Sequence, residues 1–119
     1  MRIFYLYGKY QNKKTIFGQL DHAIKKKRKI FNMSTGEQIR DYLCIKELCK
    51  LILVLVNNPN IGGIINCCSG KKLKLIQIIN KYLGQNKIFL NKGYYKIPTY
   101  EPINFWGSRK KIDRAIKTF

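Results

Sequence analysis

The chain has 119 residues, with 24 basic and only 6 acidic side chains, and its formal net charge is +18. Its hydrophobic content of 45%, with eight Tyr, six Phe and one Trp, is typical of a small folded domain and excludes a disordered chain. The longest apolar run, residues 51–56, is too short to cross a bilayer, and the N-terminus does not have the pattern of a signal peptide. We therefore expect a soluble cytoplasmic protein with no membrane partner.

The first elements predicted are a strand and a helix. Residues 3–7 are apolar on both faces, which predicts a strand buried on both sides, and Gly8 ends it. Apolar spacings of three and four predict a helix over 15–28. A strand buried on both sides needs neighbours on each edge, and nothing precedes this one. We expect a chain that enters a sheet halfway, as the product of a truncated or split gene would.

The remaining elements continue the alternation of strands and helices, which predicts an α/β architecture in one domain or part of one. Residues 93–107, rich in Pro and aromatic residues, predict irregular structure. The other expected elements are strands at 29–33 and 39–45, a helix at 46–57, a strand at 63–68, a helix at 73–83, a strand at 87–90, and a helix that Ser108 caps and that runs to about 117.

The excess of positive charge has two readings. It could mark a protein that binds nucleic acid. Alternatively, it reflects a bias toward Lys, Ile and Asn, which number 19, 18 and 10. Nucleic-acid binding gives no reason for excess Ile, and it favours Arg, which supplies only five of the 24 cations. The bias is the better explanation. The run at 25–29 fits a solvated helix end better than a polyanion site, so we expect only non-specific binding of nucleic acid.

The four cysteines do not suggest a metal site. Cys44, Cys49, Cys67 and Cys68 form no CxxC pair, and the single His22 is remote in sequence. A structural zinc needs four ligands, usually in close pairs, so no metal is expected. Reduced thiols that pack as small hydrophobes are the simpler interpretation.

Four segments resemble one family, over roughly residues 1–117. Residues 2–11, RIFYLYGKYQ, are similar to the R-x-F-N-x-Y-G-P-x-Q segment of extended short-chain dehydrogenases that act on nucleotide sugars. Residues 36–42, GEQIRDY, resemble their G-x-x-x-R-D-[FY] segment. Residues 45–47 stand where the family has V-D-D, and residues 66–70, NCCSG, resemble its N-x-x-S-G. Each motif alone is weak, but four in the same order and spacing identify the chain as a member of this family of NAD(P)-dependent epimerases and dehydratases.

The resemblance implies a partial Rossmann-like fold, namely the C-terminal strands and helices that include the small substrate-binding domain. The family's glycine-rich dinucleotide loop and its catalytic Tyr-x-x-x-Lys lie upstream of the matched segments, so neither is expected in this chain. Residues 5–9 fit Tyr-x-x-x-Lys literally, but Tyr5 belongs to the Y-G segment and no suitable Ser or Thr precedes it. Lys9, Tyr5 and the pair Lys46-Glu47 depart from the family pattern, and the segments are nearest to the 4-keto-sugar reductases and CDP- or dTDP-sugar synthases.

The function implied is that of the C-terminal part of a sugar epimerase, dehydratase or 4-keto-reductase in carbohydrate biosynthesis. It would bind a UDP-, CDP- or dTDP-linked sugar, with NAD or NADP in the intact enzyme, and this chain alone would bind no cofactor and have no activity. The sequence alone leaves its status as an enzyme open. Two alternatives stay open: a stand-alone basic protein that binds nucleic acid, and a subunit that completes a separate Rossmann chain in trans.

The resemblance also suggests substrate-binding residues. Arg40 is the first candidate, since the family's Arg contacts the diphosphate and a guanidinium fork suits phosphate oxygens; the alternative is an ion pair with Asp41 or Glu37. Asp41 itself is expected to hold local structure, because a second negative charge would repel a diphosphate.

Four further residues are candidates for substrate contact. Phe31 would bracket the nucleobase, or it is simply a core aromatic. Gln11 would approach the sugar, and Trp106 would close over the ligand. Arg109 would reach the diphosphate, or it is only solvated. We predict no catalytic, cofactor-binding or metal-binding residues in this chain.

Overall fold

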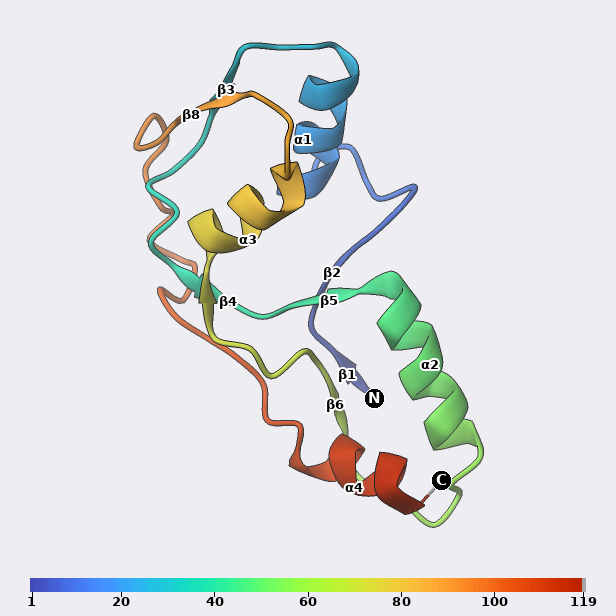
Figure 1. Cartoon of the computed structure of the whole chain (residues 1–119). Coiled ribbons are helices and arrows are strands. Elements are labelled where there is room, and N and C mark those ends of the chain that lie inside the picture. Colours follow the sequence, from blue (N-terminus) through green and yellow to red (C-terminus); the bar gives the residue numbers. More distant parts are fainter. Residues whose placement is uncertain (119) are drawn as a thin grey trace. The chain divides into compact units, whose positions relative to one another are not determined.

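A computed structural model describes residues 1–118, which form two compact units (Figure 1). Unit 1 comprises residues 1–9, 41–72 and 105 onward, and unit 2 comprises residues 10–40 and 73–104. Each unit contains helices and short, mostly parallel strands, so the α/β fold class is confirmed.

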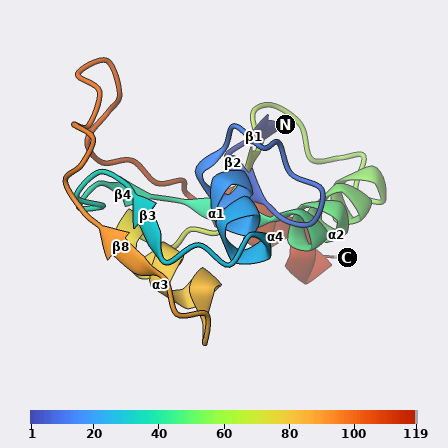
Figure 2. The same cartoon turned by 90° about the horizontal axis from the view of Figure 1, so that it is seen from above.

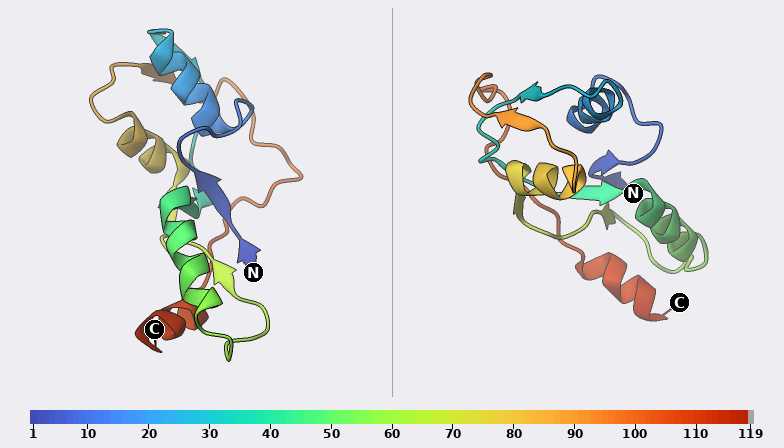
Figure 3. Two further views of the ribbon diagram at one scale, coloured as in Figure 1. Left: turned by 90° about the vertical axis from the view of Figure 1, so that its right-hand side faces the viewer. Right: turned by 45° about the horizontal axis from the view of Figure 1, so that its top comes forward.

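Unit 1 contains two parallel strand pairs and two helices. Strand β1 (Arg2–Ile3) pairs with β6 (Asn66–Cys67), and β2 (Tyr5–Tyr7) pairs with β5 (Tyr42–Cys44), so that Leu6 lies opposite Leu43. Helices α2 (Ile45–Val56) and α4 (Lys110–Thr118) contact each other, as the views in Figure 3 show. The buried core of this unit is small and consists of Leu43, Leu48, Leu51, Ile65, Cys67 and Ile112.

Unit 2 contains the other strand pairs and the two helices α1 (Ile16–Lys25) and α3 (Leu75–Leu83). Strand β3 (Ile30–Asn32) is parallel to β8 (Phe89–Asn91), and the two lie side by side in Figure 2. Strand β4 (Ile39–Arg40) is antiparallel to β7 (Leu73–Lys74). The core is formed by the apolar stripes of both helices and by β3; its buried members are Phe17, Leu20, Ala23, Phe31, Met33, Leu75, Ile79 and Leu83.

Helices α1 and α3 each begin at a hydrogen bond between a side chain and a backbone amide at the first turn. The Thr15 hydroxyl accepts a hydrogen bond from the Gly18 amide and so caps α1, one of the commonest N-terminal arrangements. At α3, the side chain of Gln77 accepts from the Lys74 amide. Helix α1 ends at Lys25 instead of Arg28, because Lys27 takes a positive φ of 53°, and the basic residues that follow are exposed as expected.

One turn of unit 2 requires glycine. Gly36 has φ of +71°, and a Cβ there would lie 2.8 Å from the Cβ of Ile76 and 3.0 Å from the Cε of Met33. The carbonyl of Gly36 also accepts the Ile76 amide at 3.0 Å. The turn therefore packs directly on α3, which a side chain at this position would prevent.

Several sequence predictions were wrong in detail. The strand expected at 3–7 is split, and Ile3 and Tyr5 are 47% and 45% exposed, not buried on both sides. Within the described residues, each of its two parts forms a ladder with one other strand.

The other differences arise at strand ends. The strand expected at 39–45 is interrupted at Asp41, whose carboxylate accepts a hydrogen bond from the Ser69 amide. Ile45, expected as the last residue of that strand, is the first residue of α2. The strand at 63–68 shortens to β6, and the helix at 73–83 loses its first two residues to β7. Cys67 at the end of β6 and Cys68 just after it are both fully buried free thiols.

Candidate functional site

A hollow of about 390 Å³ lies in unit 2 between α1 and β3. Its lining combines apolar groups with two amides, an imidazole and two cations, a composition suited to a ligand with a flat apolar part and a polar edge. The lining residues are Lys13, Gln19, His22, Ala23, Arg28, Ile30, Phe31, Asn32 and Tyr95.

The position of Phe31 in this hollow follows from the strand. Residues alternate along β3, so Ile30 and Asn32 are exposed while Phe31 is only 8% exposed. Phe31 pairs with Leu90 of β8 and packs in the core, yet it still forms part of the hollow's wall. The two readings of this residue, core aromatic and wall of a ligand site, are therefore compatible.

Gln11 lies at a second hollow of about 400 Å³, which shares Lys13 and His22 with the first. Its side-chain amide donates to Asp21 at 2.7 Å and to the Tyr82 hydroxyl at 3.1 Å, and that hydroxyl donates to the other carboxylate oxygen of Asp21. These hydrogen bonds fix the Gln11 side chain between α1 and α3.

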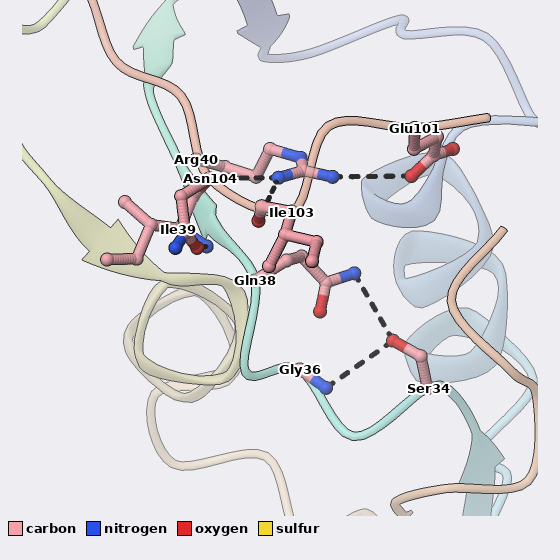
Figure 4. Close-up of polar contacts among 8 residues, drawn as sticks. All are labelled: Ser34, Gly36, Gln38, Ile39, Arg40, Glu101, Ile103 and Asn104. Carbon is pink, nitrogen blue, oxygen red and sulfur yellow. Dashed lines mark hydrogen bonds and ion pairs between the residues drawn. The ribbon is translucent and has the colours of Figure 1, made fainter. Parts of the chain in front are cut away.

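Arg40 is almost wholly buried, with 3% of the residue exposed, and Figure 4 shows its polar contacts. Its Nη1 donates to the carbonyls of Ile39 and Ile103, both at 2.9 Å, and its Nη2 lies 3.3 Å from Oε2 of Glu101. The ion-pair partner is thus Glu101, and not Asp41 or Glu37, which were the partners considered in the alternative to a ligand role. Glu37 instead pairs with Lys74 at 2.8 Å, and this contact lowers the pKa of the Glu37 carboxyl.

Asp41 has the structural role that was expected of it. Its carboxylate is fully buried in unit 1 and accepts four hydrogen bonds: the amide and hydroxyl of Ser69 at 2.8 and 2.6 Å, the Gly70 amide at 3.0 Å and the Gly107 amide at 3.1 Å. A buried charge is tolerated when its lone pairs are satisfied in this way. The carboxylate therefore joins the R-D segment to the S-G turn and to the chain before α4.

Trp106 and Arg109 lie in unit 1. Trp106 is 48% exposed, and the Lys72 ammonium lies 4.7 Å from its ring centroid, within the range of a cation–π contact. Arg109 is not simply solvated: its Nη1 donates to the Cys68 carbonyl at 2.6 Å, and its Nε and Nη2 contact Asp113 at 3.1 and 3.0 Å. Among the five predicted residues, Gln11, Phe31 and Arg40 belong to unit 2 and these two to unit 1.

Burial changes the titration of three groups in unit 1. Desolvation raises the pKa of Tyr7, with smaller contributions from Cys44 and Glu47, and it raises the pKa of the Cys67 and Cys68 thiols. These thiols therefore stay protonated at neutral pH and are poor nucleophiles. Among residues 1–118, no three His, Cys, Asp or Glu side chains gather as metal ligands.

Helices α1, α2 and α3 do not offer the site that the pyrophosphate of a dinucleotide needs. Such a site needs a strand that leads through a glycine turn to an open helix N-terminus. At α1 the Thr15 hydroxyl already occupies the Gly18 amide, and a Cβ at Gly18 would meet the Asn12 carbonyl oxygen at 2.1 Å. Helices α2 and α3 follow their strands with no intervening residue. No helix of the described chain is long and apolar enough to span a membrane.

Sequence reasoning missed several residues of these sites. His22 lines both hollows, which its spacing of three residues from Gln19 on α1 could have indicated. Tyr95, Tyr82 and Glu101 come from distant segments, and no local pattern marks them.

Comparison with known proteins identifies the family. The family model described as the NAD dependent epimerase/dehydratase family matches residues 1–68, which include the first three resembling segments and most of the hollow described above. The chain belongs to this family. Among curated epimerase/dehydratase relatives, dTDP-6-deoxy-L-talose 4-dehydrogenase (NAD(+)) from Aggregatibacter actinomycetemcomitans is 25% identical over 111 residues, which are 92% of this chain and 41% of that protein.

Solved structures of the family share its Rossmann-like fold. An NAD-dependent NDP-hexosamine 5,6-dehydratase involved in tunicamycin biosynthesis superposes with a TM-score of 0.81 at 20% identity, covering 97% of this chain and 38% of that one. The UDP-glucuronic acid 4-epimerase of Bacillus cereus, solved in complex with UDP-glucuronic acid and NAD, superposes with a TM-score of 0.79 at 21% identity, covering 98% and 38%. The chain thus spans about two fifths of the length of these relatives.

Proposed function

We propose that this chain is the C-terminal, nucleotide-sugar-binding part of an NAD(P)-dependent sugar epimerase, dehydratase or 4-keto-reductase. The observation that carries the proposal is the hollow between α1 and β3, because most of its lining lies within the family-matched residues. A substrate of this class, a UDP-, CDP- or dTDP-linked sugar, has the flat base and charged diphosphate that the site requires.

The base would enter the hollow against Phe31. Asn32 and Gln19 offer amide groups that can read the hydrogen-bonding edge of a base, and Tyr95 offers an aromatic face. Lys13 and Arg28 supply positive charge near the same lining, where phosphate oxygens would be favoured.

Arg40 would bind the diphosphate, and Gln11 the sugar. The guanidinium is already oriented by two carbonyls, which is the kind of preorganisation that strengthens binding. Trp106 and Arg109 of unit 1 stay predicted substrate-binding residues. NAD(P) would supply hydride transfer at the sugar in the intact enzyme, and on this proposal residues outside this chain hold it.

The proposal is tested by nucleotide binding. In an enzyme reconstituted with the missing N-terminal part, Arg40→Lys keeps the charge but loses the fork, and should weaken nucleotide-sugar binding by about 1–3 kcal/mol. The matched control is Arg114→Lys on the exposed face of α4, which should change nothing. Equal affinities of wild type and Arg40→Lys would refute the proposed role of Arg40, and failure of the reconstituted enzyme to bind UDP-, CDP- and dTDP-sugars would refute the function.

A second proposal concerns a partner chain. Strand β1 is hydrogen-bonded to one other strand only among the described residues, and Met1, Ile3 and Tyr5 are 63%, 47% and 45% exposed. A strand edge without a neighbouring strand accepts a further strand or aggregates. We propose that this chain completes a separate Rossmann chain in trans. Purified alone it should self-associate in sedimentation, and co-expression with a Rossmann chain bearing G-x-x-G-x-x-G should give a soluble complex; a monomer that gains no partner would contradict this.

A further inference from the structure

We propose that Glu101 is a built-in competitor for the diphosphate at Arg40, so that unit 2 rests in a self-blocked state which only a strongly anionic ligand opens. This inference rests on the proposed function and adds a regulation to the same site. Its basis is the arrangement in Figure 4, where the carboxylate of Glu101 approaches the outer nitrogen of the Arg40 guanidinium.

The Arg40 guanidinium is held in two different ways. Nη1 donates to two backbone carbonyls at 2.9 Å, contacts that carry no net charge and that set the orientation of the group. Nη2 meets Glu101 at 3.3 Å, which is longer than the 2.7–2.9 Å typical of a strong charged hydrogen bond. The contact with Glu101 is therefore the weaker one, and the group can exchange this partner without losing its orientation.

Arg40 and Glu101 differ in how deeply their side chains are buried and in how firmly the chain around them is held. The Arg40 side chain is 4% exposed, whereas that of Glu101 is 35% exposed. Glu101 belongs to the irregular segment 92–104, with one turn bond from its own amide to the Pro98 carbonyl at 3.1 Å. Water can reach the Glu101 carboxylate and solvate it when it leaves Arg40. Moving Glu101 out of the ion pair therefore costs much less free energy than moving the buried Arg40.

Gln38, two residues before Arg40, has a buried side-chain oxygen without a hydrogen-bond donor among the described residues. Gln38 is 6% exposed, its amide nitrogen donates to the Ser34 hydroxyl at 3.3 Å, and its Oε1 has no hydrogen-bond partner among the described residues. Buried side-chain acceptors are rarely left unpaired in a final, ligand-bound arrangement. A nucleotide sugar carries both a charged diphosphate, which suits Arg40, and hydroxyl donors of the kind that Gln38 lacks.

The competition predicts a selectivity for charge. One carboxylate carries a single negative charge, and a diphosphate carries at least two, with several acceptor oxygens for the guanidinium fork. A diphosphate can therefore displace Glu101, whereas an uncharged nucleoside cannot. Removing the carboxylate should strengthen diphosphate binding and leave nucleoside binding unchanged.

The test is calorimetric titration of UDP and of uridine into the 119-residue chain and its variants. Glu101→Gln should bind UDP roughly two- to five-fold more tightly than wild type, the scale of releasing one partly exposed ion pair, with uridine unchanged. Glu101→Ala should show the same gain in UDP affinity, so that the result does not depend on one substitution. Circular dichroism checks that each variant is folded. Glu37→Gln is the matched control, because it removes a carboxylate from the same unit that pairs with Lys74, and it should bind UDP like wild type.

The outcomes separate the two proposals. If both Glu101 variants bind UDP with unchanged or lower affinity while Arg40→Lys weakens it, the competitor is refuted and the proposed function stands. If no form of the chain binds UDP and Arg40→Lys makes no difference in the reconstituted enzyme, both are refuted.

Discussion

Replacing Asp41 with asparagine tests the role assigned to its carboxylate. The change keeps the size of the side chain and one acceptor oxygen, but it removes the charge and introduces two donors. In wild type, Oδ2 accepts the amides of Gly70 and Gly107, and Oδ1 accepts the amide and the hydroxyl of Ser69. The side-chain amide of the variant must therefore face donors in either orientation.

The less costly orientation can be identified from these contacts. An NH₂ group at the Oδ2 position would oppose two backbone amides, neither of which can reverse. At the Oδ1 position it would oppose the single amide of Ser69, while the Ser69 hydroxyl can rotate and accept. The asparagine side chain should choose the second orientation, losing one charged hydrogen bond outright and weakening two others, which amounts to about 2–4 kcal/mol. A small domain has only about 5–15 kcal/mol of stability, so the loss is large.

The measurement is urea unfolding followed by circular dichroism. Asp41→Asn should lower the unfolding free energy by the amount above, whereas Asp41→Ala, which loses all four bonds, should leave too little stability for the fold. Asp113→Asn is the control; that carboxylate is about half exposed and contacts Arg109 on α4, and its loss should cost less than about 1 kcal/mol. An unfolding midpoint for Asp41→Asn equal to that of wild type would show that the carboxylate does not hold the loops together.

Three further predictions follow from charge and burial. Iodoacetamide should label the exposed Cys49 well before Cys67 and Cys68, whose burial raises their thiol pKa, and mass spectrometry of equally rapid labelling would contradict the buried placement. The hydrogen bond from Lys50 lowers the pKa of Glu47, so the pair is formed at neutral pH and is lost as the pH falls through that lowered pKa; in Lys50→Met an NMR titration should find the Glu47 pKa raised toward its ordinary value, and an unchanged pKa would refute the contact. Binding to duplex DNA should be weak, indifferent to sequence and steeply reduced by salt, as measured by fluorescence anisotropy at two salt concentrations; tight sequence-selective binding would instead favour a nucleic-acid-binding protein.

Local sequence patterns predicted most of the secondary structure. The apolar stripe of α1 and the capping residue Thr15 are signals within one or two helical turns, and the helix lies where they indicate. The ends of the strands were harder to predict, because they depend on residues that are distant in the sequence and contact the strand only in the folded protein. Nothing near Asp41 indicates that its carboxylate binds Ser69 and Gly107, and this contact is what divides the expected strand at 39–45.

The candidate site was predicted only in part, for the same physical reason. The family resemblance led to Arg40 and Phe31, and the structure places the second of these in the wall of a hollow. The sequence could not indicate Glu101 as a partner of Arg40, because 61 residues separate the two. Partners of buried charges are selected by three-dimensional proximity, which a single sequence does not encode in any local pattern.

The interleaving of the two units has a consequence for how the protein folds during synthesis. The chain passes between the units at residues 9–10, 40–41, 72–73 and 104–105, so neither unit is a continuous segment. As the ribosome releases the chain, β1 must wait for β6, β3 must wait for β8, and Ile112 and Ala115 are the last buried residues of unit 1 to be made. Pairings of such long sequence separation form slowly and leave apolar segments uncovered meanwhile. We therefore expect the nascent chain to need chaperone protection until the residues of α4 have emerged.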